Sequence, residues 1–260
     1  MAGKINHNYG PRVHILDNLY LNSILARFGH PDIFQPELNH LLHVLYTGLL
    51  TEVINGIFPA TKRSVDTRMK AYTPKGVIKG VLVNPETPVV TVDLARAGIL
   101  PSHYLYEFLN HLMKPEVVRQ DHFFLNRRTD EKGQVIGVDV SGSKIGGGQE
   151  GAVVLFPDPM AATGGSISYA IGHYKEHVEG AAYRYVTMHL IVTPEYIKRM
   201  SKEHPDVEIF AIRLDRGYSS ERALNSTPGT YPDEESGLNE MQYIVPGAGG
   251  IGELLNNSLV

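Results

Sequence analysis

One short run of residues places an acid, a hydroxyl group and small residues in an order that suits phosphate chemistry. Val153 to Phe156 are four apolar residues in a row, which is typical of a buried parallel strand. Asp158 follows at the carboxyl end of that strand, and Thr163-Gly164-Gly165-Ser166 then opens an apolar-periodic segment that we expect to be a helix. Backbone N–H groups at a helix start, with the helix dipole, bind phosphate monoesters. The run therefore predicts a ribose-phosphate cradle, with the Asp158 carboxylate available to ribose hydroxyls or Mg²⁺.

The same run resembles the loop that binds phosphoribosyl pyrophosphate (PRPP) in uracil phosphoribosyltransferases. Residues 158–166 read Asp-Pro-Met-Ala-Ala-Thr-Gly-Gly-Ser, and the family's usual form has Leu where Ala161 stands. An ordinary strand–loop–helix connection is the alternative interpretation, and it is the default for an isolated Gly-Gly-Ser. The resemblance implies that PRPP is bound by this whole phosphate loop, which consists of Asp158, Pro159, Met160, Ala161, Ala162, Thr163, Gly164, Gly165 and Ser166.

Two arginine segments also follow the order of that family. Arg96 lies in Leu-Ala-Arg-Ala-Gly after a predicted strand, and an arginine beside such a small turn can present its guanidinium to phosphate oxygens. The resemblance implies that Arg96 contacts pyrophosphate and that Arg127 is a second phosphate contact, with Arg128 as the alternative. We take Arg96, Arg127 and Asp158 as the candidate catalytic residues. Residues 129–151 are then expected to form a flexible arm that closes over the phosphates and excludes water.

A glycine-rich segment near the C-terminus resembles the family's uracil-binding sequence, Tyr-Ile-Val-Pro-Gly-x-Gly-Asp-x-Gly-Asp. Such a turn allows backbone C=O and N–H groups to approach the edges of a flat, neutral base. The resemblance implies that residues 241–256 form a hood over the base. The uracil-binding residues it implies are Tyr243, Ile244, Gly249, Gly250 and Ile251.

The hood departs from the family pattern at Gly250, where the family has an aspartate that contacts PRPP and its metal-water shell. We keep Gly250 among the PRPP-binding positions. Loss of a charge-assisted contact costs roughly 1.5–3 kcal/mol, which is about a ten- to hundredfold effect on affinity or rate. Glu253 is the nearest possible substitute.

Composition and length bound the remaining possibilities. The chain has 260 residues, which suits one domain with a sizeable core. Its net charge is −4, which does not suggest general electrostatic binding of nucleic acid. It contains no cysteine, so disulfides and thiolate metal sites are excluded. Neither a signal peptide nor an apolar run of ~20 residues is evident. We therefore predict a soluble, cytoplasmic protein without a membrane partner.

The middle of the chain alternates between strand-like and helix-like patterns, which predicts an α/β fold with a twisted parallel sheet flanked by helices. The resemblance makes this the type I phosphoribosyltransferase fold in a single domain. Apolar stripes place helices within 14–56, the first of them through Leu16, Leu19, Tyr20 and Ile24. Residues 59–76 are predicted to be a loop or edge segment, residues 77–216 the α/β core, and residues 217–240 a mobile surface insertion.

The resemblance as a whole implies a transferase that converts uracil and PRPP into UMP and pyrophosphate, in pyrimidine salvage. It implies Mg²⁺ held mainly by PRPP rather than by protein ligands, and a homodimer or higher homo-oligomer with the early helices as candidate interface. Two alternatives stay open: a non-catalytic relative that binds PRPP or a nucleotide, and a phosphoribosyltransferase for another base. The helically spaced pairs His40/His43 and His173/His177 are interpreted as polar helix faces, because neither has an identifiable third ligand.

Overall fold

The central feature of the fold is a sheet of mostly parallel strands. We describe it from a computed structural model that covers residues 3–129 and 135–258, with the side chains of 126–140 outside the description. In this part of the chain nine strands form the sheet, in the order β1-β2-β11-β10-β8-β5-β6-β7, and β9 pairs with β10. The outer strands β1 and β7 are antiparallel to their neighbours, and the strands between them are parallel. The strands are β1 (Gly3–Lys4), β2 (Val13–Asp17), β5 (Val89–Ala95), β6 (Val118–Thr129), β7 (Val135–Lys144), β8 (Val153–Pro157), β9 (Met160–Ala161), β10 (Arg184–Val192) and β11 (Glu208–Leu214).

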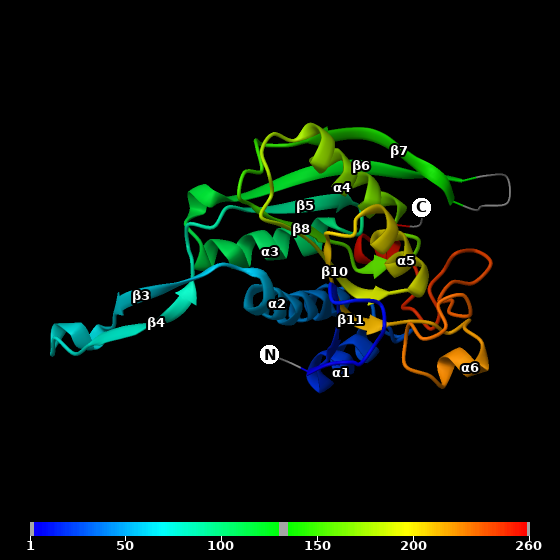
Figure 1. The fold of residues 1–260 in the computed structure, drawn as a ribbon, viewed down its shortest axis with the longest axis horizontal. Helices are drawn as coiled ribbons and strands as arrows, with labels where there is room; N and C mark the ends of the chain where they lie inside the picture. The colour runs from blue at the N-terminus through cyan, green and yellow to red at the C-terminus, as the bar shows by residue number, and fades with distance from the viewer. Residues whose placement is uncertain (1–2, 130–134, 259–260) are drawn as a thin grey trace.

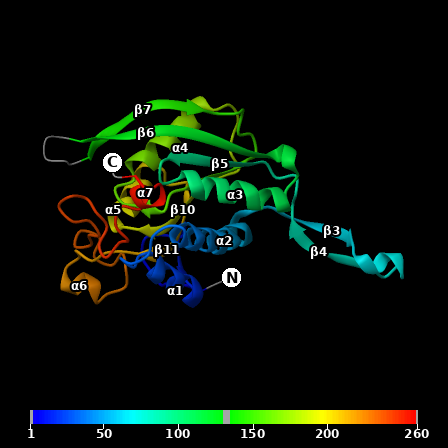
Figure 2. The same ribbon diagram turned by 180° about the vertical axis from the view of Figure 1, so that it is seen from behind.

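Helices cover both faces of this sheet (Figures 1 and 2). One face packs against α1 (Leu19–Phe28), α2 (Glu37–Ile57) and α3 (Ile99–Leu112), and the other against α4 (Gly165–His177) and α5 (Pro194–Glu203). The residues of β8 are all apolar because the strand is buried on both sides. Leu155 packs in the core on the face with α1, α2 and α3, Phe156 packs in the core on the face with α4 and α5, and both are fully buried. A strand buried on both faces has no polar side, as the sequence predicts. The predicted α/β class, with a parallel sheet flanked by helices, is confirmed.

The N-terminal boundary of the first helix differs from the prediction. Residues 13–17 form β2, which pairs in parallel with β11, so Leu16 is a strand residue rather than a helical one. Helix α1 begins at Leu19, after Asn18, whose side chain accepts a hydrogen bond from the Leu21 N–H group. The prediction failed because a helical spacing that includes Leu16 also fits an alternating strand followed by a capped helix. Leu19 is 86% exposed, and the buried side of α1 consists of Leu21, Leu25 and Phe28.

Residues 60–83 form a separate hairpin that projects from the body of the protein (Figure 1). Strands β3 (Ala60–Asp66) and β4 (Val77–Val83) pair antiparallel with each other, and a 3-10 helix at Arg68–Ala71 lies between them. The predicted loop or edge segment therefore contains a strand, and the predicted core boundary at 77 is wrong, because β4 lies outside the central sheet. A second 3-10 helix covers Pro115–Val117.

The segment 217–240 is packed against the body rather than extended as a loose loop. Its ends are adjacent, since the Tyr218 N–H group donates to the Ser236 carbonyl at 2.9 Å. It contains a short helix, α6 (Glu221–Leu224). Arg216 forms an ion pair of 2.9 Å with Glu235, whose side chain is 1% exposed. The Tyr9 hydroxyl donates to the same carboxylate. A buried charge with these partners fixes the segment, which sequence composition alone did not predict.

Candidate active site

A cavity of about 620 Å³ lies beyond the carboxyl ends of β5 and β8 and beside the middle of β6. Ligands of open α/β sheets bind at this edge. The cavity is bounded by the turn after β5, the phosphate loop after β8 and the C-terminal hood, which includes α7 (Ile251–Leu255). Its lining is Leu94, Ala95, Arg96, Ala97, Phe124, Leu125, Ser141, Asp158, Met160, Ala162, Ser166, Gln242, Tyr243, Ile244, Gly249, Gly250, Ile251, Gly252 and Glu253.

The phosphate loop ends at the N-terminus of α4, as the sequence predicts. Gly164 precedes the helix with φ +77°, a left-handed conformation that favours glycine. A Cβ atom at Gly164 would also lie 2.9 Å from Cδ2 of Tyr196. The first N–H groups of a helix have no intrahelical acceptor, and a small hollow of about 30 Å³ lies against them. The hollow is lined by Asp158, Met160, Ala161, Ala162, Thr163, Gly164, Gly165, Ser166, Ile167 and Tyr196.

Asp158 is held at the end of β8 by three kinds of contact. Its N–H group donates to the Met188 carbonyl at 3.1 Å, and its Oδ1 accepts from the Met160 N–H group at 3.1 Å. Its own carbonyl oxygen lies 2.6 Å from Nδ1 of His189. Burial lowers the pKa of His189 to about 4, so the ring is neutral, and Nδ1 must be its protonated nitrogen because a carbonyl can only accept. Nε2 then accepts from the Tyr196 hydroxyl at 2.8 Å.

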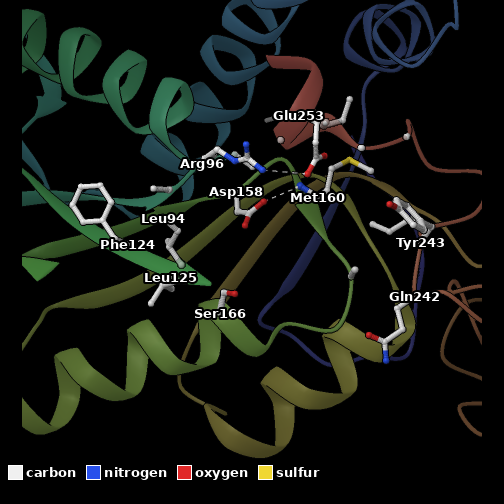
Figure 3. A pocket seen from close by; sticks show the side chains of 18 of the residues that line it. Leu94, Arg96, Phe124, Leu125, Asp158, Met160, Ser166, Gln242, Tyr243 and Glu253 are labelled. Carbon is white, nitrogen blue, oxygen red and sulfur yellow. Dashed lines mark hydrogen bonds and ion pairs between the residues drawn. The ribbon is translucent and has the colours of Figure 1, made fainter. Parts of the chain in front are cut away.

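Arg96 occupies a tight turn between β5 and α3. The Gly98 N–H group donates to the Leu94 carbonyl at 2.9 Å, and a Cβ at Gly98 would lie 2.8 Å from that oxygen, so the turn requires glycine. The Ala95–Arg96 peptide bond is cis. The Arg96 guanidinium donates to the Ser258 hydroxyl and lies 3.6 Å from Oε1 of Glu253. Arg96 therefore points across the cavity toward the hood (Figure 3).

The hood is fixed to the sheet by a pair of residues at the end of β11. Asp215, which is 2% exposed, accepts from Nε and Nη2 of Arg213 at 2.6 and 2.8 Å. The same carboxylate accepts from the Gly247 N–H group at 2.7 Å, while Arg213 donates to the Gly247 carbonyl at 3.0 Å. Both backbone groups of one residue in the turn are thus tied to β11. This arrangement holds the hood in place, and Tyr243 and Ile251 of the hood line the cavity.

The structure brings together most of the predicted site, from segments more than 140 residues apart. Arg96, Asp158 and Ser166 line the same cavity as the five predicted uracil-binding residues of the hood. Pro159 differs: it is buried, lies outside both cavity linings, and its carbonyl accepts from the N–H groups of Leu190 and Ile191. The Arg127 side chain lies outside the described residues, although its backbone pairs with Val138 in the β6–β7 ribbon. The predicted arm is partly this ribbon, and residues 130–134 also lie outside the described residues.

Several lining residues were not predicted from the sequence. Phe124, Leu125 and Ser141 come from the β6–β7 ribbon, and Gln242 adjoins the Tyr-Ile-Val-Pro-Gly turn. Leu125 begins the segment Leu-Asn-Arg-Arg-Thr that contains Arg127, and this is the one local signal that could have identified it. Among the described residues, no group of three or more His, Asp or Glu side chains could hold a metal ion. No helix in the described part of the chain is long and apolar enough to cross a membrane.

The family model that matches this chain and two relatives of similar sequence carry the same description. A family model described as uracil phosphoribosyltransferase matches residues 15–233. The uracil phosphoribosyltransferase of Thermococcus kodakarensis is 25% identical over 196 residues, which are 75% of this chain and 72% of that protein. The enzyme of the same name from Fervidobacterium nodosum is 26% identical over 207 residues, covering 76% of this chain and 79% of that protein.

Other matches are closer in sequence but shorter. The uracil phosphoribosyltransferase of Caldanaerobacter subterraneus is 39% identical over 102 residues, which are 39% of this chain and 38% of that protein. Among solved structures, the AQ2163 protein from Aquifex aeolicus superposes with a TM-score of 0.70 at 22% identity, over 95% of this chain and 100% of that chain. This last similarity is one of fold.

Proposed function

The chain belongs to the uracil phosphoribosyltransferase family, glycosyltransferases that convert uracil and PRPP into UMP and pyrophosphate, and we propose that the cavity between the phosphate loop and the hood is where this transfer takes place. The observation that carries the proposal is a spatial one. The N-terminus of α4, the Arg96 turn and the glycine-rich hood all open onto one cavity.

Each part of the cavity suits one part of the substrates. The N–H groups of Thr163 to Ser166 bind the 5′-phosphate, because they lie at the positive end of α4. The Asp158 carboxylate, at the end of β8, accepts hydrogen bonds from ribose hydroxyls. Arg96, together with Arg127, binds the pyrophosphate group. The backbone groups of the hood bind the edges of uracil, with Ile244 and Ile251 against its faces.

The reaction breaks the bond between ribose C1 and pyrophosphate, forms the bond from C1 to uracil N1 and releases the N1 proton together with pyrophosphate. Negative charge develops on the departing pyrophosphate, and the Arg96 guanidinium stabilises it. Mg²⁺, when it is bound with PRPP, neutralises part of the same charge. The Asp158 and Glu253 carboxylates face the cavity and would accept hydrogen bonds from the water ligands of such an ion. The hood and the phosphate loop hold the two reacting atoms in line, which supplies much of the acceleration.

The test is to incubate the protein with PRPP, Mg²⁺ and one base at a time, and to measure pyrophosphate release. Release with uracil is the expected result. Release with a different base alone would transfer the proposal to that base, because backbone contacts define base specificity loosely. PRPP binding without release with any base would instead identify a binding protein.

We include in the proposal a homodimer and a cytoplasmic location. The exposed apolar side chains favour self-association: Tyr72 and Val81 on the β3–β4 hairpin are 83% and 65% exposed, and Leu19 on α1 is 86% exposed. Light scattering of the protein as it elutes from a size-exclusion column measures the mass of the oligomer directly. Val81→Glu or Leu19→Glu should yield monomer if the substituted side chain lies in the interface.

A further inference from the structure

Gly250 and Glu253 are related in a way that explains the unusual glycine. The family sequence has aspartate at both positions, whereas this chain has glycine at the first and glutamate at the second. Gly250 directly precedes α7, and Glu253 follows three residues later. A Cβ atom at Gly250 would lie 2.7 Å from Oε2 of Glu253, so the Glu253 carboxylate could not keep its present position. The glycine therefore leaves the space that the Glu253 carboxylate occupies.

The Glu253 carboxylate belongs to the cavity. It is part of the cavity lining, and its Oε1 lies 3.6 Å from Nη2 of Arg96. Its side chain is 47% exposed, so a ligand can reach it. Figure 3 shows Glu253, Arg96 and Asp158 converging from α7, the turn after β5 and the end of β8. Two carboxylates and a guanidinium thus meet at the place where the proposed function puts ribose and pyrophosphate.

We propose that Glu253 supplies the carboxylate that the family carries at the position of Gly250. Residues three apart in a helical turn lie on the same face, so the longer glutamate side chain reaches back to the space in front of Gly250. There it accepts hydrogen bonds from PRPP or from the water ligands of its Mg²⁺, and it fixes the orientation of Arg96. The inference rests on the proposed function, because it assigns a role toward PRPP.

If Glu253 takes the place of a carboxylate at position 250, a second carboxylate at that position should not improve PRPP binding while Glu253 is present. An aspartate at 250 would displace the end of the Glu253 side chain and would place two negative charges close together. The same aspartate should be useful once residue 253 is an uncharged glutamine, because the repulsion between the two carboxylates is then absent. Four proteins test this: the wild type, Glu253→Gln, Gly250→Asp and the double variant Gly250→Asp/Glu253→Gln. Glu176→Gln on α4 is the matched control, since that side chain is 74% exposed and lies outside the cavity lining.

Isothermal titration calorimetry measures the dissociation constant of PRPP for each protein. The titrations contain no uracil and are made with and without Mg²⁺. We expect Glu253→Gln to weaken PRPP binding about ten- to a hundredfold in Mg²⁺ and to reduce the gain in affinity that Mg²⁺ provides. Gly250→Asp should bind no more tightly than the wild type. The dissociation constant of the double variant should return to within a few-fold of the wild-type value. The dissociation constant of Glu176→Gln should equal that of the wild type. Unfolding midpoints near that of the wild type identify the variants as folded.

Three results would overturn the inference: wild-type affinity in Glu253→Gln, tighter binding in Gly250→Asp alone, or a double variant as weak as Glu253→Gln. These leave the proposed function intact, because the wild type still binds PRPP. A wild type that does not bind PRPP at all would overturn the proposed function and the inference with it.

Discussion

The carbonyl oxygen of Asp158 and the ring of His189 are joined by a hydrogen bond of 2.6 Å in the interior of the protein. The other ring nitrogen of His189 accepts from the Tyr196 hydroxyl at 2.8 Å, and the Tyr196 ring lies beside Gly164. One buried chain of contacts therefore supports both ends of the phosphate loop. Positions without any contact to substrate are thus expected to control how the loop binds phosphate.

The neutral His189 predicts a loss of stability in mild acid. Its folded pKa of about 4 is below the unfolded value of 6.5, so the unfolded chain binds the proton more readily. The contribution of His189 to stability is complete above about pH 6.5 and is lost as the pH falls from 6.5 toward 4. Between pH 7 and 5 this amounts to roughly 2 kcal/mol in the free energy of unfolding. Urea unfolding at both pH values measures it.

His189→Asn provides the comparison. The asparagine amide can still donate to the Asp158 carbonyl but does not titrate, so the difference in unfolding free energy between pH 7 and 5 should shrink. The other histidines whose pKa is lowered by burial, among them His7 and His204, remain in both proteins and cancel. An equal pH dependence in the two proteins would show that His189 does not hold a depressed pKa.

Asp158→Asn should reduce turnover without affecting the fold. Asparagine keeps an oxygen that can accept from the Met160 N–H group, but it lacks the negative charge toward the ribose hydroxyls. Removing a charge-assisted contact of this kind lowers kcat/KM by about ten- to a hundredfold. Steady-state kinetics with PRPP and uracil, and the thermal unfolding midpoint, measure the two effects. An Asp158→Asn protein with wild-type kcat/KM would remove Asp158 from the mechanism.

Gly164→Ala should damage both stability and PRPP binding. Alanine in a left-handed conformation costs about 1–2 kcal/mol, and the contact with the Tyr196 ring adds to this cost or displaces the loop. Gly151→Ala is the control, since Gly151 has φ +67° and nothing within 4 Å of an added Cβ. The unfolding free energy and the KM for PRPP should both be worse for Gly164→Ala. Equal values for the two variants would mean that Tyr196 does not constrain the loop.

Asp215→Asn should affect the base more than PRPP. The substitution weakens the pair with Arg213 and the contact with the Gly247 N–H group, and both hold the hood in place. We expect the KM for uracil to rise roughly tenfold, from the loss of charge-assisted hydrogen bonds, with a smaller change in the KM for PRPP. Glu234→Gln, which disrupts an exposed ion pair with Arg222 at 3.8 Å, should change neither KM. An equal rise in both KM values would argue against a role specific to the hood.

The local motifs were predictable because each is a short, continuous stretch with its own chemistry. The strand before Asp158 and the helix after Gly165 follow from an apolar run and a glycine-rich start, and the structure has both. The central alternation of strands and helices was predictable for the same reason. Strand β2 was missed because its parallel partner, β11, lies almost 200 residues away in the sequence, and its nearer partner, β1, has only two residues. Pairing over that distance leaves no local trace in five residues.

The supporting contacts of the site could not be predicted either. Nothing in the sequence near Asp158 indicates that His189 bonds to its carbonyl, and nothing near Gly247 indicates the Arg213–Asp215 pair. The role of Glu253 depends on the direction in which α7 points its side chain, which is a property of the folded hood. Residues 59–76 looked like a loop or edge segment because β3 is largely exposed on both faces and has no buried side to set an alternating pattern. Residues 77–83 were assigned to the core, although β4 is also largely exposed.

The central claim is that the first N–H groups of α4 bind the 5′-phosphate, and a crystal structure of the protein with UMP tests it most directly. The account predicts the phosphate within hydrogen-bond distance of the backbone nitrogens of residues 163–166, the ribose at Asp158 and the uracil ring under the hood. A phosphate bound elsewhere, with those four nitrogens facing other acceptors, would contradict it.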